Sequence, residues 1–223
     1  MQSPLIQTEG ISKSYILGNQ ELEVLKGIDL QIDVGEFVSI MGQSGSGKST
    51  LMNIIGMLDI PSHGKYRFNG QDVSELSSDD LALVRRQNIG FIFQNYNLLP
   101  RMSAWDQVMV PLLYQGVTRS LREERAFEAL KKVGLADKLK SLPSEMSGGQ
   151  QQRVAVARAI VSDPLLILGD EPTGALDSRT GNEVMELISL LHEEGKTVVI
   201  ITHSSEIDTF AKRHIFMKDG LIV

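Results

Sequence analysis

The 223-residue chain contains no cysteine, which excludes disulfide bonds, thiolate catalysis and thiolate metal sites. Aromatic residues make up only 5% of it, and no apolar run approaches the roughly 18 residues that a membrane-spanning helix needs. Its formal net charge of −6 disfavours loose electrostatic attachment to nucleic acid or to an anionic bilayer. The first residues lack the basic-then-apolar pattern of a signal peptide. These absences predict a cytoplasmic protein with no nucleic-acid partner, and any membrane role would have to come through another protein.

Apolar runs alternate with an amphipathic helical pattern in the last third of the chain. Residues 165–169 and 197–202 are typical of buried strands, and residues 180–194 between them are typical of a helix. This alternation indicates a parallel sheet covered on both faces. The first seventy residues instead show short strand-type runs separated by turns, at residues 25–32, 37–41 and 66–69. The predicted fold class is therefore α/β.

Helix-type segments dominate the region from about residue 96 to residue 145. We expect helices at residues 104–114, 119–133 and 136–139, punctuated by Gly116 and Gly134. We interpret this region as a helical subdomain, at about residues 96–145, within a single domain that covers residues 1–223.

A complete phosphate loop follows the strand pattern of residues 37–41. It is Gly42-Gln43-Ser44-Gly45-Ser46-Gly47-Lys48-Ser49, and a helical pattern continues through Thr50 to Ile55. Its glycines let successive backbone N–H groups point at phosphates, at the N-terminus of a helix. Lys48 supplies positive charge to the β and γ phosphates, and the Ser49 hydroxyl is placed to bind Mg²⁺. Because a strand and a helix flank it, a chance glycine-rich turn is the weaker interpretation.

Asp170 and Glu171 directly follow the apolar run of residues 165–169. At the carboxyl edge of a parallel sheet, where ligands of such sheets bind, Asp170 can hold Mg²⁺ through its water shell. Glu171 can point to the other side and act as the general base that activates water against the γ-phosphate. In isolation, an exposed turn or a helix cap would explain this acidic pair better. Downstream of a phosphate loop, a catalytic role is favoured.

Gln94 and His203 also follow strand-like runs, at residues 89–93 and 198–202. Gln94 is placed to reach both the metal and the γ-phosphate, and His203 lies at the same predicted sheet edge. A lone glutamine or histidine is more often a structural residue. Their positions at strand ends beside the phosphate loop favour catalytic roles for both.

The segment Met146-Ser147-Gly148-Gly149-Gln150 precedes a helical pattern that continues to Ala159. By itself it would be an ordinary serine N-cap followed by flexible glycines. Together with the phosphate loop, Gln94, Asp170, Glu171, His203 and the turn Gly174-Ala175-Leu176-Asp177, it resembles the ATP-binding-cassette (ABC) ATPase family over essentially the whole chain.

This resemblance implies a phosphate-loop NTPase core with a mainly parallel sheet, an N-terminal antiparallel β region and a helical subdomain insertion. It also implies a head-to-tail dimer with a second copy, in which two ATP molecules with Mg²⁺ are sandwiched at the interface. Each nucleotide contacts residues 42–50 of one copy and the signature segment of the other copy. The signature segment consists of Ser147, Gly148, Gly149 and Gln150. Asp177 is expected to cross the interface. Tyr15 is expected to stack on adenine, with a half-buried core position as the alternative.

Within the family, the chain is most similar to the small ATPases of the MacB, LolD and FtsE group, through residues 23–27, 49–56, 89–94 and 170–178. The similarity implies an ATPase at the cytoplasmic face of a membrane that drives a permease, as a separate subunit or a fused domain. It also implies that the permease carries out export or force transmission, with macrolide-, peptide- or lipoprotein-type substrates. An FtsE-like cell-division ATPase and an ATP-dependent dimerisation switch without transport remain alternatives.

A cluster of apolar residues after Gln94 is the expected place for the permease to dock. Most of them serve the core of the helical subdomain, and some are expected to line a groove for a short permease helix. The cluster consists of Tyr96, Leu98, Leu99, Met102, Trp105, Val108 and Met109.

Overall fold

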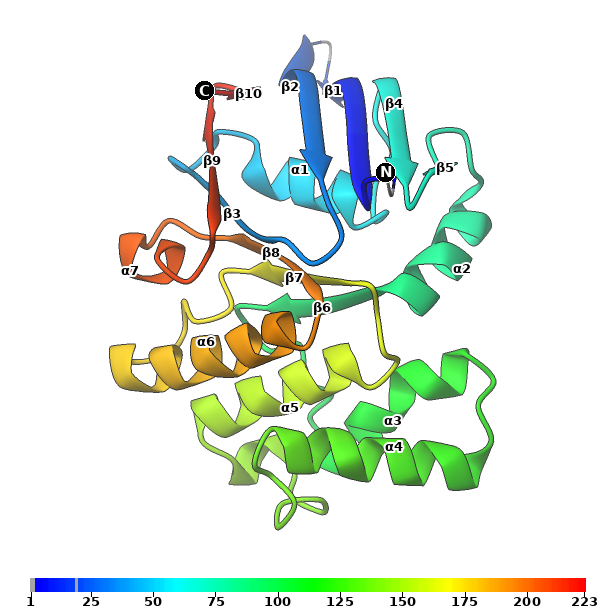
Figure 1. Cartoon of the computed structure of the whole chain (residues 1–223), viewed down its shortest axis with the longest axis vertical. Coiled ribbons are helices and arrows are strands. Elements are labelled where there is room, and N and C mark those ends of the chain that lie inside the picture. Colours follow the sequence, from blue (N-terminus) through cyan, green and yellow to red (C-terminus); the bar gives the residue numbers. More distant parts are fainter. Residues whose placement is uncertain (1–2, 19) are drawn as a thin grey trace. The chain divides into compact units, whose positions relative to one another are not determined.

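The computed structural model describes residues 3–18 and 20–223 and divides the chain into two compact units. The first unit comprises Met1–Arg85 and Thr197–Val223, and the second comprises Arg86–Lys196. Helix α2 (Ser78–Asn88) carries the chain from the first unit into the second (Figure 1). Among the helices of the described residues, none is long and apolar enough to cross a membrane.

The first unit contains a four-stranded antiparallel sheet in the order β2–β1–β4–β5. Its strands are β1 (Ile6–Leu17), β2 (Gln20–Ile32), β4 (His63–Phe68) and β5 (Gln71–Asp72). Along the end of β2, buried Ile28, Leu30 and Ile32 alternate with exposed residues. This alternation is the pattern of a sheet that has one covered face. The predicted N-terminal antiparallel β region is confirmed.

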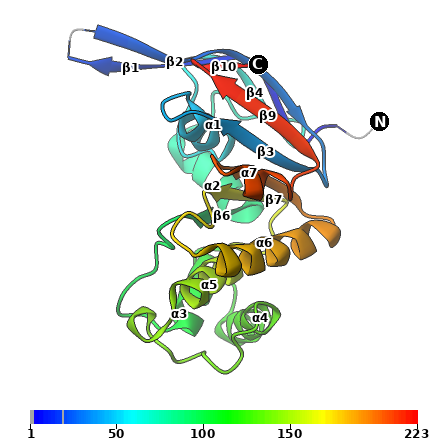
Figure 2. The ribbon, with the colours of Figure 1, turned by 90° about the vertical axis from the view of Figure 1, so that its left-hand side faces the viewer.

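Four further strands of the first unit lie in the order β10–β9–β3–β8. They are β3 (Phe37–Gly42), β8 (Thr197–Ile201), β9 (Arg213–Lys218) and β10 (Leu221–Ile222). Strand β3 runs parallel to both β8 and β9, and it lies beside β9 in Figure 2. Strand β8 is buried along its whole length, as is usual for a strand of a parallel sheet that is covered on both faces. In the same unit, helix α1 (Lys48–Ile55) follows β3, and helix α7 (Ser205–Asp208) follows β8.

The second unit combines the parallel strands β6 (Ile89–Phe93) and β7 (Leu166–Asp170) with helices. The helices are α3 (Ala104–Tyr114), α4 (Arg119–Lys132), the 3₁₀ helix η1 (Pro143–Glu145), α5 (Gly148–Ile160) and α6 (Ser178–Glu193). Helix α5 contacts α3, α4, α6 and β6, and Figure 1 shows it beside α3 and α4. A Cβ on Gly90 of β6 would overlap with the carbonyl oxygen of Ala159. Glycine therefore permits the close approach of β6 to α5.

The structure bears out most of the predicted elements and corrects one. Helices α3 and α4 match the predictions at residues 104–114 and 119–133 closely. Residues 136–139 form turns instead of the predicted helix, with a bond from the Lys138 N–H to the Leu135 carbonyl oxygen. Four residues are too few to offset the cost of helix nucleation. Helix α2 is not indicated by the hydrophobic pattern, because Leu81 is its only buried residue among those described.

Candidate functional site

The phosphate loop lies in the first unit, between β3 and α1. Gly47 is the N-cap of α1 with a φ of 100°, and no side chain caps this helix. The first N–H groups of α1 therefore have no partner within the helix, and the helix dipole makes them an anion site. At Gly45, with a φ of +80°, an added Cβ would meet no atom within 4 Å. The loop is thus curved and open above its backbone.

Two buried polar side chains of this loop, Lys48 and Ser46, determine which kind of ligand it can bind. Lys48 is only 8% exposed, and its Nζ donates to the carbonyl oxygens of Gly42 at 2.7 Å and Gln43 at 2.8 Å. The Ser46 hydroxyl is buried and has no hydrogen-bond partner among the described residues. A buried ammonium gains more from ionised oxygens than from neutral carbonyls, and a buried hydroxyl needs a partner. Both features fit a bound phosphate group.

His203 lies at the end of the sheet where the phosphate loop begins. Ile40 of β3 is paired in register with Ile201 of β8, and the Thr202 N–H bonds the Ile40 carbonyl oxygen at 3.2 Å. Gly42 and His203 each follow this pair by two residues, and His203 is exposed. The predicted position of His203 at the strand end is confirmed, and its catalytic role stays a prediction.

Tyr15 of β1 is half-buried in a polar cluster and not in the apolar core. Its hydroxyl donates to Asp59 Oδ2 at 3.0 Å, and Lys13 Nζ donates to Asp59 Oδ1 at 2.7 Å. Lys13 Nζ also lies 5.1 Å from the centroid of the Tyr15 ring. Burial, with the hydrogen bond to Asp59, raises the pKa of Tyr15 above its ordinary value. The ring is thus oriented by polar contacts, and stacking on adenine stays a prediction.

Gln94, Asp170 and Glu171 meet at one end of the β6–β7 pair in the second unit. Phe93 is paired in register with Asp170, so Gln94 and Glu171 both follow this pair directly. The Gln94 amide packs on Gly174, where an added Cβ would lie 2.7 Å from Gln94 Nε2. Glu171 has a φ of 45°, which is uncommon for a residue other than glycine. This strained conformation at a predicted catalytic carboxylate is typical of functional sites.

The signature segment forms the N-terminus of α5 through a reciprocal cap. The Ser147 hydroxyl accepts from the Gln150 N–H at 3.3 Å, and Gln150 Oε1 accepts from the Ser147 N–H at 3.0 Å. This capping box satisfies two donors of the first turn. Gly149 is buried, and a Cβ there would overlap with Thr180 Cγ2 of α6. Ser147 is exposed, as the predicted role opposite a second copy requires.

Asp177 is the N-cap of α6. Its carboxylate accepts from the Thr180 N–H at 3.1 Å and from the Thr180 hydroxyl at 2.8 Å. These bonds lower the pKa of Asp177 below its ordinary value. Asp177 is exposed, so this capping role is compatible with the predicted role at a dimer interface. An aspartate directly before a helical pattern is the sequence signal for such a cap.

The structure assembles the predicted residues into two groups, one in each unit. The first unit holds Tyr15, residues 42–50 and His203, and the second holds Gln94, residues 147–150, Asp170, Glu171 and Asp177. Two polar residues in the interior of α5, Gln152 and Arg158, contact the chain around Gln94 but were not predicted. Their partners around Gln94 are backbone carbonyls about sixty residues away, which no local pattern indicates.

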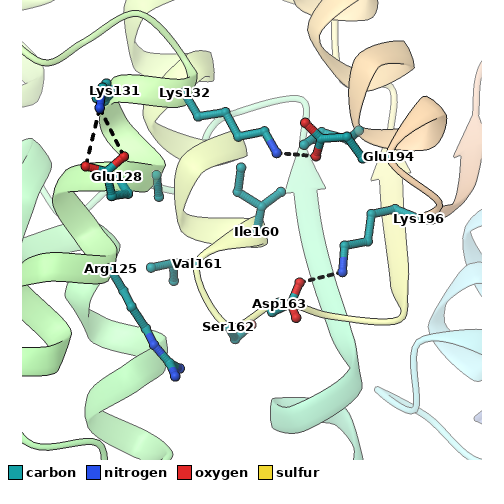
Figure 3. A pocket seen from close by; sticks show the side chains of 12 residues that line it. Arg125, Glu128, Lys131, Lys132, Ile160, Val161, Ser162, Asp163, Glu194 and Lys196 are labelled. Carbon is teal, nitrogen blue, oxygen red and sulfur yellow. Dashed lines mark hydrogen bonds and ion pairs between the residues drawn. The ribbon is translucent and has the colours of Figure 1, made fainter.

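A pocket of about 910 Å³ in the second unit contains none of the predicted residues (Figure 3). It is lined by α4, the end of α5 and the end of α6. Ion pairs surround it: Lys196 lies 2.5 Å from Asp163, Lys131 lies 3.3 Å from Glu128, and Lys132 contacts Glu194. Because these three lysines are paired with carboxylates, their charges are largely compensated within the pocket.

Comparison with known proteins identifies the class of the chain. Residues 25–174 match the family model described as ABC transporter. The chain therefore belongs to the ABC transporter family, and it is an ABC-type ATP-binding domain. The predicted family and the predicted fold are confirmed.

Its relatives narrow the class further. The chain is 55% identical over 222 residues to the macrolide export ATP-binding/permease protein MacB of Wolinella succinogenes, covering 100% of this chain and 34% of that protein. It is 51% identical to the uncharacterized ABC transporter ATP-binding protein YknY of Bacillus subtilis, covering 98% of this chain and 95% of that one. The chain thus spans about a third of the MacB relatives and nearly all of YknY.

Solved structures agree with this assignment. A dimeric ATP-binding cassette in a post-hydrolysis state, bound to ADP and Pi, matches with a TM-score of 0.89 and 43% identity. The match covers 97% of this chain and 96% of that one. The predicted similarity to MacB-type ATPases and the prediction of an ATPase domain are both confirmed.

Proposed function

We propose that the chain is the ATP-hydrolysing domain or subunit of a transporter and that it works as a head-to-tail dimer. Each ATP contacts the phosphate loop of one copy and the signature segment of the other. The observation that supports this most is the phosphate loop itself. There, a buried Lys48 ammonium rests on two neutral carbonyls beside an unpartnered Ser46 hydroxyl, at an uncapped helix. Residues 1–223 act in this proposal as one domain with a helical subdomain at about residues 96–145.

In this proposal, two parts of the first unit bind the nucleotide, one at the adenine and one at the phosphates. Tyr15 stacks on the adenine, and the N–H groups of the loop bind the phosphates through Gly42, Ser44, Gly45, Ser46, Gly47, Lys48, Ser49 and Thr50. The open space above Gly45 supports this placement of the phosphates. The buried position of Lys48 supports its role as the cation of the β and γ phosphates.

The residues present also fit a magnesium ion. Ser49, Gln94 and Asp170 offer a hydroxyl, an amide oxygen and one carboxylate, which are the hard oxygen donors that Mg²⁺ prefers beside substrate phosphates. When bound, Mg²⁺ would neutralise charge that develops on the transferring phosphoryl group.

Hydrolysis follows from the groups around the γ-phosphate. Glu171 accepts a proton from a water, whose oxygen forms a bond to the γ-phosphorus while the bond to the β-γ bridging oxygen breaks. Lys48, His203 and Gln94 stabilise the charge on the phosphoryl group, and Ser147 of the second copy closes the site. Asp177 lies at the interface between the copies. ADP and phosphate are the products, and their formation releases the dimer.

The partner in this proposal is a membrane permease, either fused or separate, which holds the chain at the cytoplasmic face of a membrane. The MacB relatives are ATP-binding/permease proteins for macrolide export, and this chain spans about a third of their length. We infer export or force transmission, with macrolide-, peptide- or lipoprotein-type substrates. In the predicted docking cluster Leu99 is 51% exposed whereas Val108 is buried, so Leu99 is the better candidate for contact with the permease.

The solution mass of Glu171→Gln tests the dimer. With ATP the mass should double, whereas with ADP it should stay that of a monomer. The double variant Lys48→Ala, Glu171→Gln should remain a monomer with either nucleotide. A variant that dimerises with ATP while wild-type protein shows no turnover would indicate a dimerisation switch instead of an ATPase. A monomer with both nucleotides would contradict closure by the chain alone.

A further inference from the structure

The turn that follows Gln94 is held in a strained conformation. Tyr96 has a φ of 58° and Asn97 has a φ of 49°, so two successive residues other than glycine lie in the left-handed region. Asparagine tolerates this region, but a bulky aromatic residue rarely adopts it. The Asn97 N–H closes the turn on the Asn95 carbonyl oxygen at 2.5 Å. Such strain persists only when the surrounding structure supports it.

Arg158 of α5 supplies this support. Its Nη1 donates to the Asn97 carbonyl oxygen at 2.6 Å, and its Nη2 donates to the Tyr96 carbonyl oxygen at 2.8 Å. The planar guanidinium thus bonds both strained residues at once, through donors whose positive charge strengthens each bond. Burial lowers the pKa of Arg158, but an arginine stays charged throughout the physiological range.

The strained turn also brings Tyr96 to the signature segment. A Cβ added to Gly148 would lie 2.9 Å from the Tyr96 hydroxyl oxygen, so the ring end of Tyr96 lies beside the first turn of α5. On the other side of Gln94, the Gln152 amide donates to the Phe93 carbonyl oxygen at 3.3 Å. Helix α5, which begins at the signature, therefore holds the chain both before and after Gln94.

We propose that Arg158 is a positioning residue, which keeps the turn of residues 95–97 in its left-handed form and thereby sets Gln94 relative to the signature segment. This inference rests on the proposed function, because it takes Gln94 as a group that acts on Mg²⁺ and the γ-phosphate. Arg158 itself touches neither.

Arg158→Gln tests the proposal, with Arg153→Gln as the matched control. Arg153 lies on the same helix, but its guanidinium bonds the Val133 carbonyl oxygen at 3.3 Å and Glu183 at 3.0 Å, away from the turn. The first measurement is hydrogen exchange of residues 93–99, which needs no nucleotide. Arg158→Gln should speed this exchange about tenfold or more, because it removes two strong hydrogen bonds, while Arg153→Gln should not. Equal exchange in the two variants would overturn the proposal.

The second measurement is the Mg²⁺ concentration that gives half-maximal ATPase activity. Arg158→Gln should raise it about 10-fold or more, as loss of an outer partner of a metal site does. Adding Asn97→Gly should recover part of the loss, because glycine adopts the left-handed region without strain. If the added glycine recovers nothing, Arg158 acts by packing alone and the proposal is wrong. Where Arg158→Gln does not fold, Arg158→Lys replaces it, because lysine keeps the charge but loses the bidentate hydrogen bonds. This variant should shift both measurements in the same direction.

Gln94→Ala separates this proposal from the proposed function. If Gln94→Ala changes the Mg²⁺ dependence but Arg158→Gln leaves it unchanged, the positioning role is wrong and the role of Gln94 stands. If Gln94→Ala leaves the Mg²⁺ dependence unchanged, the role of Gln94 is wrong. The positioning of Gln94 for that role is then overturned as well, even where hydrogen exchange shows that Arg158 holds the turn.

Discussion

The side-chain amide of Gln152 donates a hydrogen bond of 3.3 Å to the carbonyl oxygen of Phe93. The same nitrogen contacts the carbonyl oxygen of Pro172. Gln152 is fully buried in α5, while Phe93 precedes Gln94 and Pro172 follows Glu171. A single side chain of α5 thus bonds the backbone next to two predicted catalytic residues, Gln94 and Glu171.

Replacing Gln152 by alanine should lower the free energy of unfolding by about 2–4 kcal/mol. The change opens a cavity, removes one of the two donors to the half-buried Phe93 carbonyl and takes the Gln152 donor from the buried Pro172 carbonyl. Urea denaturation followed by circular dichroism measures it. The neighbouring change Gln151→Ala should cost about 1 kcal/mol or less, since Gln151 is only half-buried and loses one bond of 3.1 Å, to Met146. Equal costs for the two variants would contradict the role given to Gln152.

Gly149→Ala should destabilise the protein by about 1–3 kcal/mol, because the new methyl group overlaps with Thr180 Cγ2. Thr180→Ser removes that methyl and keeps the hydroxyl that bonds Asp177. The double variant should therefore be more stable than Gly149→Ala alone. The measurement is the free energy of unfolding of the wild-type protein, the two single variants and the double variant. A double variant no more stable than Gly149→Ala would show that the strain lies elsewhere.

Glu171→Gln should lower ATP turnover about 10²–10⁴-fold, since the amide cannot accept the proton of the attacking water. ATP affinity should stay near that of the wild-type protein, because the phosphate loop is unchanged. A phosphate-release assay and equilibrium binding measure the two quantities. Glu183→Gln, a change at the Arg153 ion pair on α6, serves as the control and should turn over normally. Near-normal turnover in Glu171→Gln would exclude Glu171 as the general base.

The Asp59 cluster should make stability depend on pH. Burial alone would raise the pKa of Asp59, but the hydrogen bonds from Lys13, the Ile60 N–H and Tyr15 outweigh it and lower the pKa below 3.8. The folded-state pKa is therefore depressed, so the stabilisation is present above the unfolded-state value of about 3.8 and is lost as the pH falls through the folded-state value.

Asp59→Asn should accordingly cost about 1–3 kcal/mol of unfolding free energy at pH 7, since it leaves the Lys13 ammonium buried without a carboxylate. The unfolding free energy of Asp59→Asn should approach that of the wild-type protein as the pH falls below 3.8. The double variant Lys13→Met, Asp59→Asn should lose less than the two single variants added together. A cost for Asp59→Asn that does not change with pH would refute the assignment.

Tyr15→Ala should raise the dissociation constant for ATP about 5–100-fold, which is the range for loss of one base stacked on an aromatic ring. Tyr15→Phe keeps the ring and loses only the hydroxyl bond to Asp59. It should bind ATP within about threefold of the wild-type protein while losing about 1 kcal/mol of stability. Isothermal titration with Glu171→Gln as the background avoids turnover. Unchanged affinity in Tyr15→Ala would remove Tyr15 from the adenine site.

Sequence patterns were sufficient where the structure depends on near neighbours in the chain. A buried strand, a glycine-rich loop with Lys48 and a helix specify the phosphate loop locally, and the structure has all three in that order. The strand ends that carry Asp170 and His203 follow from strand-type runs of five mainly apolar residues. The same approach was wrong at residues 136–139, because apolar spacing over four residues does not supply enough hydrogen bonds to start a helix.

The sequence alone thus determined the family, the α/β class and the identity of the candidate residues. Only the tertiary structure decided how those residues are held. The bonds of Gln152 and Arg158 to the backbone around Gln94 join positions 59 to 62 residues apart. The cluster of Tyr15, Lys13 and Asp59 and the contact of Gly149 with Thr180 likewise join separate elements. Local periodicity reports which face of an element is buried, whereas such contacts depend on how elements pack, and that is decided only when the chain folds.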